Sequence, residues 1–189
     1  MSERMLLKAG ALLLGYPDPG MLDAVCAALP DLPEMPGRDL LDGFLASARE
    51  LPRTEREALY VAAFDFREEL SLYLTFQEHG DARDRAPALL ELKQELRACG
   101  FECPEDELPD YLPLLLEFLA ERPQECDDQK LPRRVARALR GIARRMDPDA
   151  LYLPLLQAIL AALPADEGTA EPPCGDAEDL SLPYPLRYL

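Results

Sequence analysis

Prolines divide this chain into short segments and so limit what it can fold into. There are 19 prolines among 189 residues, about twice the usual frequency of ~5%. A proline inside a helix removes one backbone hydrogen bond and clashes with the preceding turn, so helices must begin or end near these positions. Between the prolines, apolar residues recur every three or four positions, which is typical of amphipathic helices. The sequence therefore predicts many short helices around a shared core.

Start and stop signals give the bounds of these helices. We expect helices at residues 1–15, 18–30, 39–50, 54–74, 86–100, 110–120, 131–146 and 147–163. Thr54 and Glu57 have the spacing of a capping box, and Asp110 is the expected N-cap of the helix that carries Pro113 in its first turn. Residues 72–76 also alternate as in a strand, but the length of the apolar run favours a helix there.

These elements predict an all-α protein. We expect one compact domain of about eight helices over residues 1–163, because no segment needs a strand partner and a chain of this length can bury a substantial core. Residues 164–189 are acidic and rich in proline, a composition that predicts a mobile C-terminal tail.

Charge limits the classes of partner. The chain has 36 acidic and 20 basic residues and a net charge of −16. Such a surface repels nucleic acid and anionic lipid and attracts basic peptides. No uncharged apolar run approaches the ~18 residues of a membrane span, so we expect a soluble protein without stable membrane insertion. The five cysteines include no CxxC pair, and we interpret them as reduced thiols of a cytoplasmic protein.

Three features could indicate catalysis, a metal or RNA, and each has a simpler interpretation. The only histidine, His79, lies beside Asp81, but without a second histidine the pair is better explained as the end of a helix capped by Gly80. Cys99 and Cys103 lack two further zinc ligands. The arginines of residues 131–146 lie opposite an apolar stripe, which is the pattern of a solvent-exposed helix face.

Two stretches combine acids with bulky apolar residues and predict a different kind of site. The helical segments 60–76 and 106–121 could form an apolar trough with an acidic rim, which would accept a basic amphipathic peptide. The predicted rim is Asp65, Glu69, Glu107, Asp110 and Glu117, and the predicted floor is Phe64, Tyr73, Tyr111, Leu114, Leu115 and Phe118. From the pattern alone, an ordinary core with ordinary surface acids is the simpler interpretation.

The segment from residue 64 to residue 120 resembles a known family. It reads FDFREELSLYLTFQEHGDARDRAPALLELKQELRACGFECPEDELPDYLPLLLEFLA. The aromatic-Asp element, SLYLT, HGDARDR, ALLELK, GFE and ELPDYLPLLLEFLA occur in it in order. This combination resembles the NarJ family, the delta-subunit chaperones of respiratory nitrate reductase.

The resemblance implies a function. It implies an all-helical assembly chaperone of the TorD, DmsD and NarJ superfamily, without catalytic activity or a cofactor of its own. Such a chaperone binds the N-terminal peptide of the apo catalytic subunit. It keeps that subunit competent for insertion of the molybdenum cofactor and an iron–sulfur cluster, and delays its membrane attachment until then. A sibling chaperone for another, twin-arginine-exported molybdoenzyme is the nearest alternative.

By the same resemblance, the trough residues bind the client peptide. Asp81, Arg83 and Arg85 are expected to shape the loop that follows His79.

Overall fold

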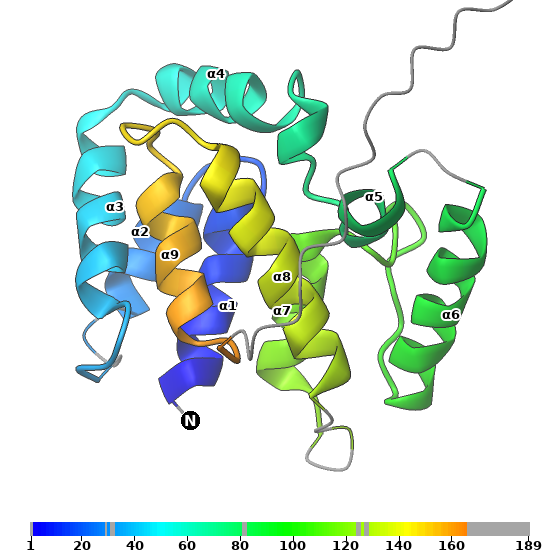
Figure 1. The fold of residues 1–189 in the computed structure, drawn as a ribbon. Coiled ribbons are helices and arrows are strands. Elements are labelled where there is room, and N and C mark those ends of the chain that lie inside the picture. The colour runs from blue at the N-terminus through cyan, green and yellow to red at the C-terminus, as the bar shows by residue number, and fades with distance from the viewer. Residues whose placement is uncertain are drawn as a thin grey trace, which may run out of the picture.

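The computed structural model describes residues 2–28, 30, 33–80, 83–123, 126 and 129–165. Over these residues the chain is all-α, as predicted, with nine α-helices, a short 3₁₀ helix and no named strand (Figure 1). The elements are α1 (Ser2–Leu14), α2 (Met21–Ala28), α3 (Arg38–Glu50), α4 (Arg53–Phe64), η2 (Glu68–Leu70), α5 (Leu74–His79), α6 (Arg85–Ala98), α7 (Leu112–Glu121), α8 (Lys130–Arg145) and α9 (Leu153–Ala161). The tail predicted at 164–189 lies outside the described residues from 166 onward.

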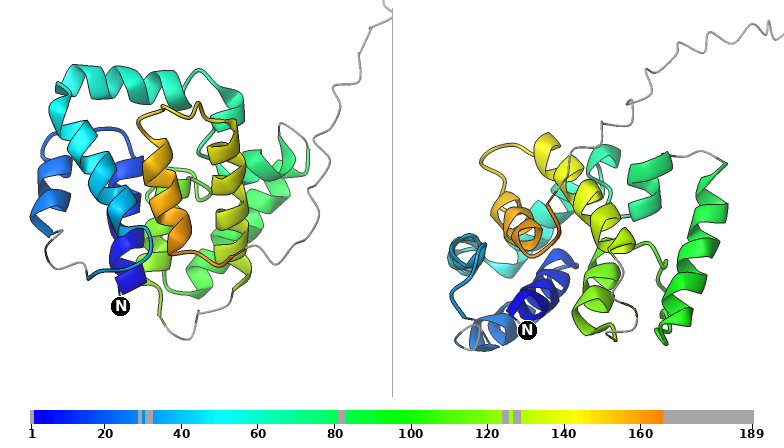
Figure 2. Two further views of the ribbon diagram at one scale, coloured as in Figure 1. Left: turned by 60° about the vertical axis from the view of Figure 1, so that its left-hand side comes forward. Right: turned by 60° about the horizontal axis from the view of Figure 1, so that its bottom comes forward.

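Helix α1 lies in the middle of the bundle. It packs against α7 and α9, and α9 also packs against α3 and α8 (Figures 1 and 2). At one edge of the bundle, α5 lies between α8 and α6 and contacts both (Figure 1). Gly10 permits the close approach of α1 to α9, since a Cβ atom at this position would lie 2.5 Å from Cγ1 of Ile159. None of the helices in the described ranges is both long and apolar enough to cross a membrane.

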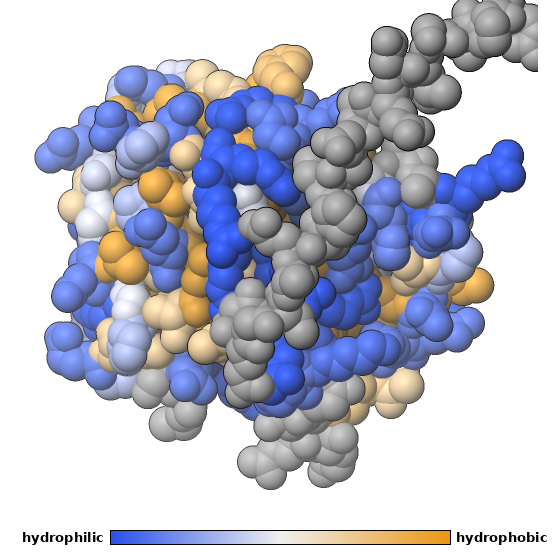
Figure 3. All heavy atoms as spheres, viewed as in Figure 1, coloured by the Kyte–Doolittle hydropathy of each residue, from blue (hydrophilic) through white to orange (hydrophobic). Residues whose placement is uncertain are grey.

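Helix α8 has the two faces that its sequence predicts. Val135, Leu139 and Ile142 are buried in the core, and the arginines of the opposite face are exposed or half-buried. The atoms visible over α8 in Figure 3 are mostly hydrophilic. Arg134 donates two hydrogen bonds of 2.8 Å to Glu78 of α5, so this face also attaches a neighbouring helix.

The helix predicted over residues 54–74 is wrong in its second half. Helix α4 ends at Phe64, η2 follows, and the chain is extended at Tyr73 before α5 begins at Leu74. Here the backbone pairs with the residues before α7, through hydrogen bonds of 2.8 Å from Leu74 N to the Asp110 carbonyl and from Leu112 N to the Leu72 carbonyl. These two hydrogen bonds take the place of the bonds that a continuous helix would form. The strand-like alternation of residues 72–76 is consistent with this extended pairing.

Two predicted helix caps are also wrong. Pro52, and not Thr54, is the N-cap of α4, and no side chain caps it. The side chain of Glu57 instead accepts a hydrogen bond of 2.6 Å from Arg53 one turn earlier. Tyr111, and not Asp110, is the N-cap of α7. At each end, contacts with other residues outweigh the local capping signal.

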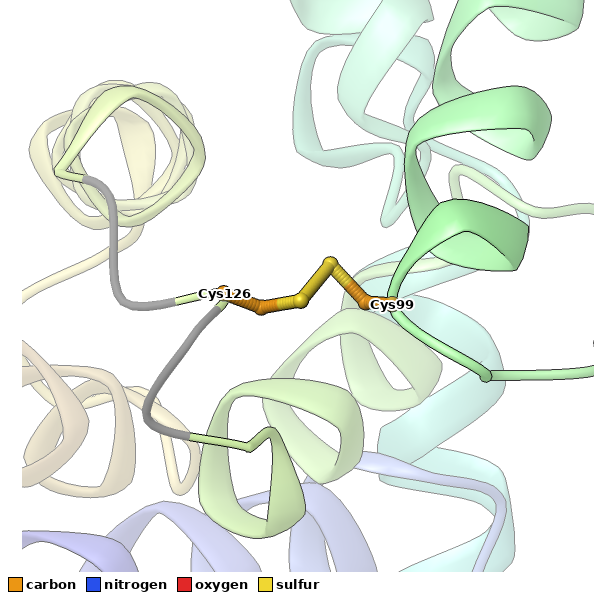
Figure 4. The surroundings of a disulfide bond; sticks show 2 residues. All are labelled: Cys99 and Cys126. Atoms are coloured by element: carbon orange, nitrogen blue, oxygen red, sulfur yellow. A yellow bond between two sulfur atoms is a disulfide. The ribbon is translucent and has the colours of Figure 1, made fainter.

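A disulfide joins Cys99, at the end of α6, to Cys126 between α7 and α8 (Figure 4). The prediction that all five cysteines are reduced is therefore wrong for these two, whose Cα atoms lie 5.9 Å apart although 27 residues separate them in sequence. Cys26 and Cys103 are free, and Cys174 lies outside the described residues. Only the tertiary fold brings the pair together, so cysteine spacing could not reveal it.

Reducing this disulfide is expected to lower the free energy of unfolding by about 2–4 kcal/mol, because the bond restricts the unfolded chain. Urea unfolding with and without dithiothreitol measures the difference. A Cys99→Ser/Cys126→Ser variant should match the reduced protein, and a Cys26→Ser variant should match the oxidised one. Equal midpoints with and without reductant would contradict the prediction.

Candidate functional site: an acidic groove between α1 and α7

The groove begins with the loop that leaves α6. Gly100, at a φ of +76°, ends the helix, and Phe101 N donates a hydrogen bond of 3.0 Å back to the Leu96 carbonyl. The Phe101 ring then packs edge-on against Phe118 of α7, with ring centroids 5.3 Å apart. One aromatic contact thus fixes the start of the loop against the helix that the loop will enter.

Three tyrosines hold the other end of the loop. Tyr111 forms an isolated antiparallel bridge with Tyr73, and the two rings lie 5.5 Å apart. The hydroxyls of Tyr111 and Tyr60 lie within hydrogen-bonding distance at 3.1 Å. Burial raises the pKa of Tyr111, and the hydrogen bond with Tyr60 lowers it by less, so the net pKa is above the ordinary value. The phenols are therefore neutral hydrogen-bonding groups at physiological pH.

Asp110 supports this arrangement from inside the protein. Its side chain is fully buried, and Oδ2 accepts hydrogen bonds from Thr75 N at 3.2 Å and from Thr75 Oγ1 at 2.5 Å. The Arg85 guanidinium lies 4.0 Å from the same oxygen and donates to Thr75 Oγ1. Asp110 therefore caps the first turn of α5 from a distant segment, and its predicted place on an exposed rim is wrong.

Between this loop and α1 lies an open groove of about 270 Å³. Figure 2 shows α1 and α7, the helices on its two sides, next to each other. The groove is lined by Ala11 and Leu12 of α1, by Pro104, Asp106 and Glu107 of the loop, and by Tyr111, Pro113, Leu114 and Glu117. Its lining is mainly apolar, and its three charged side chains, Asp106, Glu107 and Glu117, are all carboxylates. The groove can therefore accommodate apolar side chains next to a positive charge.

Four of the eleven predicted peptide-binding residues line this groove: Glu107, Tyr111, Leu114 and Glu117. Tyr73 contacts the groove indirectly, through the Tyr111 ring. Asp65 and Glu107 both raise the pKa of Tyr73, after the larger effect of its burial, so both carboxylates act on the same phenol. Asp65 and Tyr73 themselves do not line the groove.

The structure places the other predicted residues elsewhere. Leu115 and Phe118 are buried on the core side of α7. Phe64 is buried against Tyr60 and Tyr152, while Phe66, two residues later, is 82% exposed. Glu69 pairs with Arg67 at 2.9 Å beside the end of α8. Asp106 and the α1 residues Ala11 and Leu12 also line the groove but were not predicted. Nothing in the local sequence links α1 to a helix about one hundred residues later.

The predicted loop-shaping residues are only partly described. Asp81 lies outside the described residues, and Arg83 is exposed in the turn before α6. The Arg85 guanidinium lies over the Phe76 ring, 5.7 Å from its centroid, and so connects α6 with α5. Their role in shaping the loop stays a prediction.

His79 ends α5 as the sequence predicts, with Gly80 as the C-cap at a φ of +59°. Its neighbour Glu78 accepts two hydrogen bonds from Arg134 of α8. In the part of the chain that the structure describes, no three His, Cys, Asp or Glu residues are grouped as metal ligands would be.

Together, these features define an all-α protein with an acidic, partly apolar groove beside its central helix. The chain belongs to the nitrate reductase delta subunit family, whose model matches residues 22–148. It is 34% identical over 169 residues to the probable nitrate reductase molybdenum cofactor assembly chaperone NarJ of Bacillus subtilis, covering 85% of this chain and 89% of that protein.

Two further relatives match shorter segments. The nitrate reductase molybdenum cofactor assembly chaperone NarJ of Escherichia coli K12 is 35% identical over 119 residues, which are 59% of this chain and 50% of that protein. The nitrate reductase-like protein NarX of Mycobacterium tuberculosis H37Rv is 33% identical over 113 residues, or 60% of this chain and 17% of that protein. The family resemblance seen in the sequence is confirmed, and the NarJ names support a chaperone role.

Proposed function

We propose that this protein is an assembly chaperone for the catalytic subunit of a respiratory nitrate reductase. It binds the N-terminal peptide of the apo subunit in the groove between α1 and α7. It keeps that subunit competent to receive its molybdenum cofactor and iron–sulfur cluster before membrane attachment. We propose that the chaperone acts in the cytoplasm, where the client is synthesised, and that it catalyses no reaction. The observation that carries it is an acidic groove between α1 and the segment that resembles the family.

The groove suits a basic amphipathic peptide. Leu12, Leu114 and Tyr111 offer apolar surface for the buried side of such a peptide, and apolar contacts supply most of the affinity in this mode of recognition. Asp106, Glu107 and Glu117 lie beside them. Their charge, which is part of a net charge of −16 for the whole chain, raises the encounter rate with a positively charged segment.

Release follows from binding linkage and requires no chemical step. A chaperone that binds the apo subunit more tightly than the loaded one favours retention before cofactor insertion and release after it. Equal affinity for the two forms would shift nothing. Folding of the client peptide into the finished enzyme supplies the difference, because a folded segment no longer fits an open groove.

Titration calorimetry tests the proposal directly. The purified chain is titrated with a synthetic peptide that copies the N-terminus of the nitrate reductase catalytic subunit from the same genome. A scrambled peptide of equal composition is the control. Saturable binding of the native peptide alone supports the proposal. If the native peptide does not bind and a pull-down recovers a different molybdoenzyme, the sibling-chaperone alternative holds.

Peptide affinity is expected to fall as salt rises, by about tenfold between ~50 mM and ~500 mM sodium chloride. The reason is that exposed charges are screened over a Debye length of ~8 Å near physiological ionic strength, whereas the apolar contacts are not. Calorimetry at four salt concentrations measures the slope. A flat affinity across this range would show that the acidic residues contribute nothing to recognition.

A further inference from the structure

A lysine of the chain itself binds a carboxylate that lines the groove. Lys8 of α1 donates to Glu117 Oε1 and to Glu121 Oε1 of α7, each at 2.5 Å. The two glutamates lie one helical turn apart, and Glu117 lines the groove together with Ala11 and Leu12, the residues one turn after Lys8. The ammonium group therefore lies where two carboxylates converge at the edge of the proposed binding surface.

The pair of glutamates is a favourable place for a cation. Like charges one turn apart on a helix repel each other, and Lys8 relieves this repulsion with a single positive charge. Partial burial lowers the pKa of Lys8, but its hydrogen bonds to Glu117 and Glu121 together outweigh that effect and raise the pKa above the ordinary value. Lys8 therefore stays charged, and one ammonium and two carboxylates leave a net negative charge.

Lys8 is also easy to displace. Its side chain is 36% exposed, and those of Glu117 and Glu121 are 42% and 58% exposed. Ion pairs this accessible contribute little to stability. The structural ion pair of Arg134 with Glu78 differs, because both side chains are only about one-fifth exposed, at 20% and 21%, and are joined by two hydrogen bonds. A basic group from outside can replace the ammonium of Lys8 at small cost.

We propose that Glu117 and Glu121 receive a basic side chain of the client peptide, and that Lys8 occupies this position in the free protein as an internal competitor. This inference rests on the proposed function and adds a specificity-determining residue to it. An arginine of the client displaces Lys8 best, since its planar guanidinium can bond both carboxylates at once, whereas an ammonium is a single point charge. Peptides that offer only weak positive charge do not displace Lys8.

The test compares Lys8→Met with the wild-type chain, using the same synthetic N-terminal peptide and titration calorimetry at low salt. Loss of the competitor is expected to tighten binding about fivefold, or about 1 kcal/mol. The gain should shrink at high salt. It should also vanish for a peptide whose basic residues are replaced by glutamine, and in a Glu117→Gln/Glu121→Gln background.

Two control variants separate this role from others. Lys93→Met removes the same charge from an exposed position of α6 that does not line the groove, and should leave affinity within about twofold of wild type. Lys8→Arg keeps the competitor and should bind no more tightly than wild type. Urea unfolding checks that the Lys8→Met variant remains folded. If Lys8 only stabilises the fold, this variant should lose stability and bind the peptide more weakly.

The outcomes are distinct. Tighter binding by Lys8→Met alone supports the inference. If the wild-type chain binds the peptide and Lys8→Met binds it equally or more weakly, the inference is overturned and the proposed function stands. If the wild-type chain binds no peptide, both are overturned.

Discussion

Reversing the charges of Asp106 and Glu107 together is expected to weaken binding of the client peptide on the order of 100-fold. The two residues form the loop side of the groove, and the Asp106→Lys/Glu107→Lys variant replaces attraction by repulsion for a basic peptide. Like charges placed opposite each other across an interface cost several kcal/mol, and 100-fold corresponds to about 2.7 kcal/mol. Titration calorimetry at low salt measures the change.

The same loop offers a matched control for this experiment. Glu102 and Glu105 are exposed on it but do not line the groove. A Glu102→Lys/Glu105→Lys variant changes the net charge by the same amount and should bind within about threefold of wild type. If both double variants lose affinity equally, recognition depends on overall charge, and the groove is not the binding site.

Replacing Asp110 by alanine is expected to lower the free energy of unfolding by about 3 kcal/mol. The change leaves the Thr75 amide and hydroxyl without their acceptor and removes a carboxylate that lies 4.0 Å from the Arg85 guanidinium. Removing one member of a buried charged network costs about 3–5 kcal/mol, and the loss is smaller where the partner keeps some contact with water. Arg85 is a quarter exposed, which favours the lower figure.

Two further variants test the cause of this loss. Asp110→Asn keeps an acceptor and should lose about half as much stability. Thr75→Val in the Asp110→Ala background should add little, because both changes remove the same interaction. Urea unfolding of the wild type, Asp110→Ala, Thr75→Val and the double variant gives the coupling energy. Full additivity of the two losses would show that Asp110 and Thr75 act independently and would contradict the proposed cap.

Asp110 also shows how the structure changes the choice of binding variants. From its place between acids and large apolar residues, it was expected to contact the client. Because its side chain is buried and holds Thr75 in the first turn of α5, its loss would disturb the groove and the fold together. Asp106 is exposed beside the groove and reports on binding with less effect on folding.

Helices whose signals are local were predicted well. The stripe of Val135, Leu139 and Ile142 is buried in α8 as expected, and Gly100 ends α6. These features depend on residues within one or two turns of each other, so periodicity and helix punctuation suffice to find them. The all-α class follows from the same signals, repeated along the chain.

The break after Phe64 was not predicted, and the reason is tertiary. Residues 65–74 have helical spacing, but Leu72 and Leu74 form backbone hydrogen bonds with residues 110–112. A hydrogen-bonding partner about forty residues away overrides local spacing here. The same holds for the disulfide of Cys99 with Cys126 and for Asp110, whose partners lie on another segment.

Some groove residues could be predicted from the local sequence, and others are known only from the folded structure. Glu107, Tyr111, Leu114 and Glu117 could be chosen from one stretch of sequence, because acids and bulky apolar residues alternate there on a short helix and the loop before it. Their neighbours Lys8 and Leu12 could not, because α1 reaches α7 only through packing of the bundle. Local patterns specify which segments are helical and which residues can bind. Contacts between distant segments determine which of those residues meet. The reason is that the burial of a side chain and its distance from a partner are properties of the folded chain.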